Sequence, residues 1–166
     1  MSDASQASGP ELRLVEVTLD NFHDVMALQT APEQAGFVGS NAESLAECAY
    51  IEGFVPRAVC LDDDIVGLVV WGPYYPDLRY NEPPEQQTYI LDHVMIDARF
   101  QGRGFGRRLV ELALGEISFI GDCQRIVLKV ETDNRKAIEL YRQAGFSECG
   151  RDQDGDLIME RAPELS

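Results

Sequence analysis

A glycine-rich stretch, residues 101–106 (Gln-Gly-Arg-Gly-Phe-Gly), carries the clearest chemical signal in this chain of 166 residues. It joins residues 89–96, whose composition predicts a strand, to residues 107–120, whose broad apolar face predicts a helix. The glycines allow tight turning and close approach of the backbone to a ligand. Free N–H groups and the positive end of the helix dipole favour an anion. Positive charge is added by Arg103, Arg107 and Arg108. The stretch therefore predicts a binding site for a diphosphate.

The residues around these glycines argue against two common phosphate-binding loops. A P-loop requires a Lys followed by Ser or Thr after the last glycine, whereas Arg107 and Arg108 follow here. A dinucleotide-binding fingerprint requires the spacing G-x-G-x-x-G in an early βαβ unit, whereas the spacing here is G-x-G-x-G. An ordinary glycine-rich turn remains an alternative for this stretch taken alone.

A second strand–helix unit follows, with a predicted buried strand at residues 125–130 and a predicted helix at residues 135–144. From Asn134 onward the unit has the pattern Asn-x-x-Ala-x-x-Leu-Tyr-x-x-x-Gly-Phe. Tyr141 lies seven residues after Asn134, which is two helical turns, so the two residues share one face of the helix. Structural roles also fit these residues, with Asn134 as a helix cap, Tyr141 in the core and Gly145 as the helix terminator.

Together, the two motifs resemble those of the GNAT N-acetyltransferases, and the resemblance covers about residues 11–160. Gln101, Gly104 and Gly106 match that family's acetyl-coenzyme A loop, Gln/Arg-x-x-Gly-x-Gly/Ala. The resemblance implies acetyl-coenzyme A as the acyl donor. It also implies the α/β GNAT fold, a mixed, mostly antiparallel sheet of about seven strands with helices on both faces. The coenzyme-binding residues that it implies are Val94, Met95, Ile96, Gln101, Gly102, Arg103, Gly104, Phe105, Gly106, Arg107, Asn134 and Tyr141.

Acyl transfer from a thioester to an amine makes three chemical demands. The amine must lose a proton, the carbonyl must be polarised, and the departing thiolate must be stabilised or protonated. The resemblance implies that Tyr141 is the general acid beside the coenzyme sulfur, and a phenol is neutral at pH 7. It also implies that a backbone N–H at the end of the strand polarises the carbonyl, at Val94, Met95 or Ile96.

The general base is a choice between two adjacent residues. Asp92 occupies the position of an acidic residue in the small-polyamine branch of the family. It could accept the amine proton directly or through water, or pair with the substrate cation. His93 titrates in the right range, but strand alternation turns it to the opposite face unless a bulge intervenes. We therefore predict that Asp92 is the base.

The net charge of −15, from 14 basic and 29 acidic residues, bears on the acceptor. Such a surface repels nucleic acid and anionic membranes and attracts cations, although solubility alone would also explain it. The irregular stretch at residues 72–87 mixes tyrosines with acids, which suits an ammonium ligand, packing over the core or a dimer contact.

We predict a small-molecule amine acceptor, with a polyamine or diamine favoured. The alternatives are protein N-termini, amino acids or antibiotic amines, and a non-catalytic acyl-coenzyme A sensor. Acetyltransferases of protein N-termini carry a Glu five residues before the Asn, where this chain has Lys129. That difference disfavours this substrate class.

The remaining features predict the organisation of the chain. Residues 1–10 predict a disordered tail, and residues 11–166 predict one domain with the element order β–αα–βββ–α–β–α–ββ. Asn41 is predicted to cap a helix over residues 42–50. No apolar run reaches the length of a membrane span. Four widely spaced cysteines predict buried thiols rather than disulfides or a metal site, which favours a cytoplasmic location. A homodimer is compatible with the resemblance.

Overall fold

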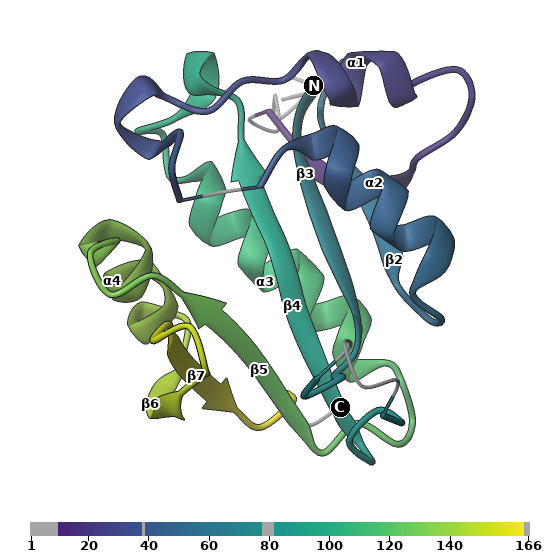
Figure 1. Cartoon of the computed structure of the whole chain (residues 1–166). Coiled ribbons are helices and arrows are strands. Elements are labelled where there is room, and N and C mark those ends of the chain that lie inside the picture. The colour runs from purple at the N-terminus through teal and green to yellow at the C-terminus, as the bar shows by residue number, and fades with distance from the viewer. Residues whose placement is uncertain (1–9, 38, 78–81, 165–166) are drawn as a thin grey trace, which may run out of the picture.

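The computed structural model describes residues 10–37, 39–77 and 82–164. The predicted tail, apart from Pro10, lies outside these ranges. Within them, seven strands form one mixed sheet in the order β1-β2-β3-β4-β5-β7-β6 (Figure 1). The strands are β1 (Leu12–Glu16), β2 (Val55–Leu61), β3 (Asp64–Pro73), β4 (Thr88–Ile96), β5 (Arg125–Val130), β6 (Ser147–Arg151) and β7 (Leu157–Arg161). The α-helices are α1 (Phe22–Ala27), α2 (Asn41–Tyr50), α3 (Phe105–Ser118) and α4 (Arg135–Gln143). Short 3₁₀ turns are η1 (Pro32–Gln34) and η3 (Ala98–Phe100).

This architecture confirms the predicted element order and fold class. β4 and β5 pair in parallel, and the other neighbouring strands pair antiparallel. The hairpin formed by β6 and β7 places β7, the later strand, against β5.

The helices lie on both faces of the sheet (Figure 1). Val25 and Leu28, in α1 and just after it, pack with Leu68, Val70 and Met95 on one face. On the other face, α3 buries an apolar stripe with helical spacing: Leu109, Val110, Ala113, Leu114 and Ile117. Each large aliphatic side chain of this stripe contributes about 1.5–3 kcal/mol by leaving water. The stripe therefore fixes α3, and with it the glycine-rich loop at the start of α3, against the sheet.

β4 and β5 separate after a short stretch of pairing. Their ladder consists of Thr88 with Arg125, Tyr89 with Ile126, and Ile90 with Val127. Beyond these pairs the two strands diverge, as Figure 1 shows. The facing edges of β4 and β5 therefore have no strand partner in this region, and their backbone groups are available to a ligand.

No helix within the described ranges has both the length and the apolar character that crossing a bilayer requires. The four cysteines form no disulfide. Cys60 is buried as expected, whereas Cys48 and Cys123 are only half-buried. Cys149, however, is exposed because it lies on β6, an edge strand whose five residues are all open to solvent.

Candidate active site

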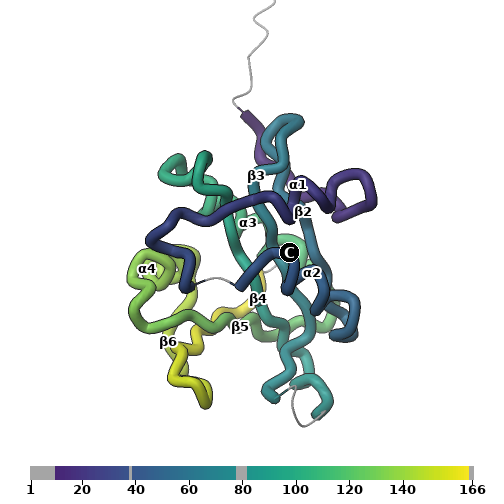
Figure 2. The backbone as a smooth tube through the Cα atoms, turned by 45° about the horizontal axis from the view of Figure 1, so that its top comes forward, coloured from purple at the N-terminus to yellow at the C-terminus, as the bar shows by residue number. Residues whose placement is uncertain are grey.

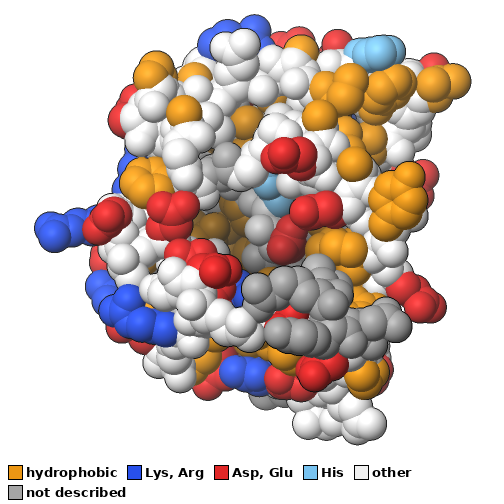
Figure 3. All heavy atoms as spheres, in the orientation of Figure 1, with side chains coloured by type: hydrophobic (Ala, Val, Ile, Leu, Met, Phe, Trp, Pro, Cys, Tyr) orange, Lys and Arg blue, Asp and Glu red, His pale blue; other side chains and the backbone are white. Residues whose placement is uncertain are grey.

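A cavity of about 380 Å³ lies where β4 and β5 separate. Its walls come from residues 92–96 on β4, residues 129–131 at the end of β5, the glycine-rich loop, and the first turn of α4. The connection from α1 to α2 arches over β4 toward α4 (Figure 2) and contributes Thr30, Gln34 and Phe37. In the space-filling view, acidic side chains gather around this hollow (Figure 3).

The glycine-rich loop is shaped to receive a ligand at the start of α3. Gly102 and Gly104 have φ angles of 75° and 81°, in the left-handed region that other residues rarely adopt. Gly104 is the N-cap of α3 and provides no side chain, so the first N–H groups of this helix have no side-chain cap among the described residues. A Cβ atom added at Gly102 or Gly104 would project into open space. These features fit an anion, as the sequence predicts for a diphosphate.

Side-chain hydrogen bonds hold this loop against β4 and the α1–α2 connection. The Gln101 amide nitrogen donates to the Ile96 carbonyl at 2.9 Å and to Gln34 Oε1 at 2.8 Å. The buried Asp97 carboxylate accepts from the backbone N–H groups of Gln29, at 3.1 Å, and Arg99, at 3.0 Å. Gln101 therefore positions the loop in addition to lining the cavity.

A β-bulge at Asp92 changes the expected alternation along β4. Leu91 pairs with Trp71 and His93 pairs with Val70, so Asp92 is an extra residue without a partner on β3. As a result, Asp92 and His93 both border the cavity, which simple alternation would not allow.

His93 is nevertheless occupied by structural hydrogen bonds. Its side chain is only 4% exposed, and its Nδ1 and Nε2 atoms each lie 3.0 Å from a partner on α2, Ser44 Oγ and Asn41 Oδ1 respectively. The Asn41 amide nitrogen donates to the Val25 carbonyl, which turns Oδ1 toward the imidazole. His93 therefore donates from Nε2 and accepts at Nδ1 from the Ser44 hydroxyl. Burial lowers the pKa of His93 to about 4, so the ring is neutral at pH 7.

The same contacts overturn the prediction that Asn41 caps α2. Ser40 is the cap: its hydroxyl accepts from the Glu43 N–H at 3.1 Å, and the Glu43 carboxylate accepts from the Ser40 N–H at 3.3 Å. This capping box frees Asn41, which is 7% exposed, to turn inward toward His93.

Asp92 lies in surroundings that make its carboxylate unusually basic. Asp92 lines the cavity, whose walls displace much of the bulk water around its carboxylate. This desolvation, together with the nearby charge of Glu47, raises the pKa of Asp92 to about 6, although the charge of Lys129 opposes the shift. A carboxylate with this pKa is ionised at pH 7 and more basic than an ordinary aspartate.

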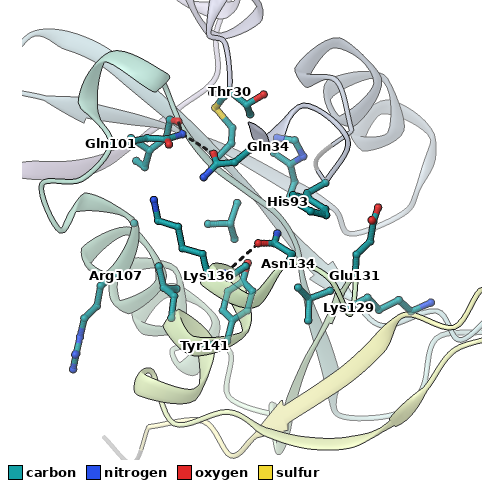
Figure 4. A pocket seen from close by; sticks show the side chains of 18 of the residues that line it. Thr30, Gln34, His93, Gln101, Arg107, Lys129, Glu131, Asn134, Lys136 and Tyr141 are labelled. Atoms are coloured by element: carbon teal, nitrogen blue, oxygen red, sulfur yellow. Dashed lines mark hydrogen bonds between the residues drawn. The ribbon is translucent and has the colours of Figure 1, made fainter. Parts of the chain in front are cut away.

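Asn134 and Tyr141 both line the cavity from α4 (Figure 4). Asn134 Oδ1 accepts from the Ala137 N–H at 3.2 Å, which confirms its capping role. The half-buried Tyr141 ring packs edge-to-face on Phe146, with 6.0 Å between ring centres. Burial raises the pKa of Tyr141 to about 12, so its phenol keeps its proton at neutral pH.

The cavity brings together most of the residues that the resemblance implied. Those that line it are Asp92, Val94, Met95, Ile96, Gln101, Gly102, Gly104, Gly106, Arg107, Asn134 and Tyr141. Arg103 and Phe105 are absent from this lining. The Arg103 guanidinium lies 4.9 Å from the centre of the Phe105 ring instead.

Several charged residues of the cavity were not assigned from the sequence. Lys129, Glu131, Lys136 and Asp156 line it, and Lys129 also pairs with Asp152 at 3.4 Å. The sequence signal for Lys136 was its position two residues after Asn134. A residue two positions after a helix cap lies in the first turn of the helix, beside the predicted coenzyme-binding Asn134.

The irregular stretch between β3 and β4 does not reach the cavity in its described part. Tyr74, which is 8% exposed, packs with Ile90 and Val127 in a small core cluster. The Tyr75 hydroxyl donates to the Glu52 carbonyl at 3.0 Å. Packing, rather than contact with a ligand in this cavity, is therefore the role of Tyr74 in this structure. Tyr80 lies outside the described residues.

Comparison with known sequences identifies the family. A profile described as the acetyltransferase (GNAT) family matches residues 19–146. The chain belongs to the GNAT family. As a GNAT acetyltransferase, it uses acetyl-coenzyme A as its acyl donor.

Individual relatives of this GNAT protein differ in the acceptors that their names state. A spermine/spermidine N(1)-acetyltransferase of Bacillus subtilis (strain 168) is 27% identical over 149 residues, which are 89% of this chain and 96% of the relative. A mycothiol acetyltransferase of Mycobacteroides abscessus is 31% identical over 117 residues, which are 70% of this chain and 37% of the relative.

Solved structures agree on the fold. Aminoglycoside acetyltransferase AAC(6')-Ib in complex with coenzyme A superposes with a TM-score of 0.74 at 17% identity, covering 92% of this chain and 95% of that one. Spermidine N-acetyltransferase from Vibrio cholerae, in complex with coenzyme A and spermine, has a TM-score of 0.70 at 19% identity and the same coverage.

The left-handed conformation of Gly104 leads to a direct prediction. Gly104→Ala should raise the Kd for coenzyme A about tenfold, because a Cβ atom strains this conformation by about 1–2 kcal/mol and shifts the loop. Gly115→Ala is a matched control in the same helix, where a Cβ atom meets nothing within 4 Å and no positive φ is required. Calorimetric titration would measure both variants. Equal affinities would show that coenzyme binding does not depend on the left-handed conformation of Gly104.

Proposed function

We propose that this GNAT enzyme acetylates a primary amine of a polyamine or diamine. The main support is the division of charge along the cavity. One end contains the glycine-rich loop, Arg107 and Lys136, whereas Glu131 and Lys129 lie at the opposite end (Figure 4). The first end suits the anionic part of coenzyme A, and the second leaves room for a cationic acceptor.

Carboxylates dominate the acceptor end. Asp92, Glu131 and Asp156 line the cavity, and the charge of Glu47 acts on Asp92 from α2. Lys129 is the opposing cation, but Asp152 pairs with it at 3.4 Å and offsets its charge. A substrate with two or more ammonium groups can therefore place one amine at Asp92 and a second near another carboxylate. The net charge of −15 would also steer such a cation toward the protein.

The residues of β4 and α4 are proposed to divide the chemistry between them. Asp92 takes a proton from the substrate ammonium, directly or through one water molecule. The neutral amine nitrogen then attacks the thioester carbonyl carbon, whose oxygen accepts a hydrogen bond from a backbone N–H of Val94, Met95 or Ile96. The new C–N bond forms, the C–S bond breaks, and the nitrogen releases its second proton to solvent. Tyr141 protonates the departing sulfur and recovers a proton from solvent, and Asp92 releases its proton to solvent.

The names of relatives support a polyamine acceptor without deciding among cationic amines. The Bacillus subtilis relative is a spermine/spermidine N(1)-acetyltransferase, and one structural neighbour contains spermine. Another structural neighbour acts on aminoglycosides, which also carry several amines. An acidic cavity suits both kinds of substrate.

A panel of acceptors would test the proposal. Thiol release from acetyl-coenzyme A should be fastest with polyamines or diamines, compared with aminoglycosides, amino acids and N-terminal peptides. The KM for the preferred polyamine should rise several-fold between about 50 and 300 mM salt, because screening weakens cation steering. Preference for a neutral acceptor with a flat salt response would refute the polyamine assignment. Tight coenzyme binding without turnover of any acceptor would favour a sensor.

A further inference from the structure

The cations at the coenzyme end of the cavity occupy two helix N-termini. The first turns of α3 and α4 both line the cavity, and neither contains an acidic residue. Arg107 and Arg108 lie in the first turn of α3, and Arg135 and Lys136 in that of α4. Cations are unfavourable at this end of a helix, because the dipole there is already positive. The helix dipole therefore does not favour these positions, although Glu111 partly compensates Arg107 and Arg108.

The arginines next to the glycine-rich loop are engaged with other groups. Arg103 stacks on Phe105. Arg107 and Arg108 pair with the same carboxylate, Glu111, at 3.2 and 3.4 Å. The Arg107 side chain also runs along α3 away from the cavity centre (Figure 4). Although Arg107 lines the cavity, its guanidinium is paired with Glu111, which leaves the cavity side of the loop to another cation.

Lys136 is placed to supply that cation. Its side chain extends from the first turn of α4 into the cavity, toward the side that contains Gln101 and the start of α3 (Figure 4). Among the described residues, no carboxylate pairs with its ammonium group. The preceding residue, Arg135, lines a different depression, together with Glu139 and Glu148. Two adjacent cations on α4 thus face different surfaces, and Lys136 is the one that faces the coenzyme site.

We propose that Lys136 binds the diphosphate of coenzyme A from α4, opposite the amides of the glycine-rich loop. The inference rests on acetyl-coenzyme A occupying this cavity. The loop supplies directional N–H donors, whereas a lysine ammonium supplies a compact charge on a flexible stem that can follow the phosphate oxygens. Lys136 would also link α4, which carries Asn134 and Tyr141, to the anchored end of the coenzyme.

Calorimetric titration with coenzyme A and with 3′-dephospho-coenzyme A tests this inference on the full chain. Lys136→Gln should weaken both ligands by the same factor, about tenfold at low salt, because both contain the diphosphate. Lys136→Arg should retain most of the affinity. Arg135→Gln is the matched control and should change either Kd less than twofold. The melting temperature of ligand-free Lys136→Gln should not fall, since the substitution removes a cation from a helix N-terminus.

Any of the following results would contradict the assignment of Lys136 to the diphosphate. Unchanged affinity in Lys136→Gln would exclude the contact. A loss seen with coenzyme A but not with its 3′-dephospho form would assign Lys136 to the 3′-phosphate instead. Equal losses in Lys136→Gln and Arg135→Gln would indicate a general charge effect. Wild-type protein that bound neither ligand would refute the proposed function as well, whereas normal wild-type binding with an unaffected Lys136→Gln would refute this inference alone.

Discussion

Replacing Asp92 with Asn is expected to lower kcat/KM for the amine by about 10²- to 10⁴-fold, the usual contribution of a general base. Asn keeps the size of the side chain at the bulge but cannot accept the ammonium proton. Steady-state rates of thiol release across a pH series would measure the loss. Wild-type kcat/KM should fall as the pH drops through about 6, because protonated Asp92 cannot act as a base. In Asp92→Asn this fall in kcat/KM, the acid limb of the pH profile, should disappear.

Stability measurements separate this loss from misfolding. Folding raises the pKa of Asp92 to about 6, so the folded state binds its proton more tightly than the unfolded state does. The stabilising contribution of this group is present below about pH 4 and is lost as the pH rises through about 6. Asp92→Asn should therefore be at least as stable as the wild type at pH 8, when both are compared by thermal unfolding.

The neighbouring histidine provides the critical comparison. His93→Gln perturbs the hydrogen bonds to Ser44 and Asn41, so it should lower the melting temperature. The acid limb near pH 6 should persist in this variant. If His93→Gln removed the limb and Asp92→Asn kept it, the two residues would have the opposite roles.

Replacing Tyr141 with Phe is expected to lower kcat by about 10²- to 10³-fold while the Kd for acetyl-coenzyme A stays within about twofold. The substitution removes only the hydroxyl, and the ring can still pack against Phe146. The loss should therefore fall on protonation of the departing sulfur. Single-turnover rates and calorimetric titration would separate the two quantities.

The leaving group gives this prediction a sharper test. Acetyl thioesters of thiols with lower pKa values need less help from an acid, so the defect of Tyr141→Phe should shrink with such donors. The phenol pKa of about 12 also means that Tyr141 should produce no loss of activity with rising pH below about pH 10. Wild-type turnover in Tyr141→Phe would exclude it as the acid.

Local backbone and helical requirements were readable from the sequence. The left-handed conformations at Gly102, Gly104 and Gly145 depend on the absence of a Cβ atom, which is a property of the residue itself. The period of the α3 stripe and the position of Asn134 before α4 are also local. The element order, the fold class and the grouping of Asn134 with Tyr141 were predictable for this reason.

Directions of side chains depended on neighbours distant in sequence. The bulge at Asp92 arises from the register of β4 against β3, which no pattern within residues 89–96 specifies. The inward turn of Asn41 depends on a capping box at Ser40 and on the polar ring of His93. Lys129 reaches the cavity because β5 diverges from β4 beyond Ile90.

The sequence by itself therefore determined that a glycine-rich helix start and an Asn/Tyr helix lie in one fold, because backbone conformation and helical spacing are encoded locally. Only the tertiary structure decided which charges face the cavity between them. It stacks Arg103 on Phe105, directs Lys136 inward and assigns His93 to α2, because a flexible side chain takes its direction from the groups packed around it.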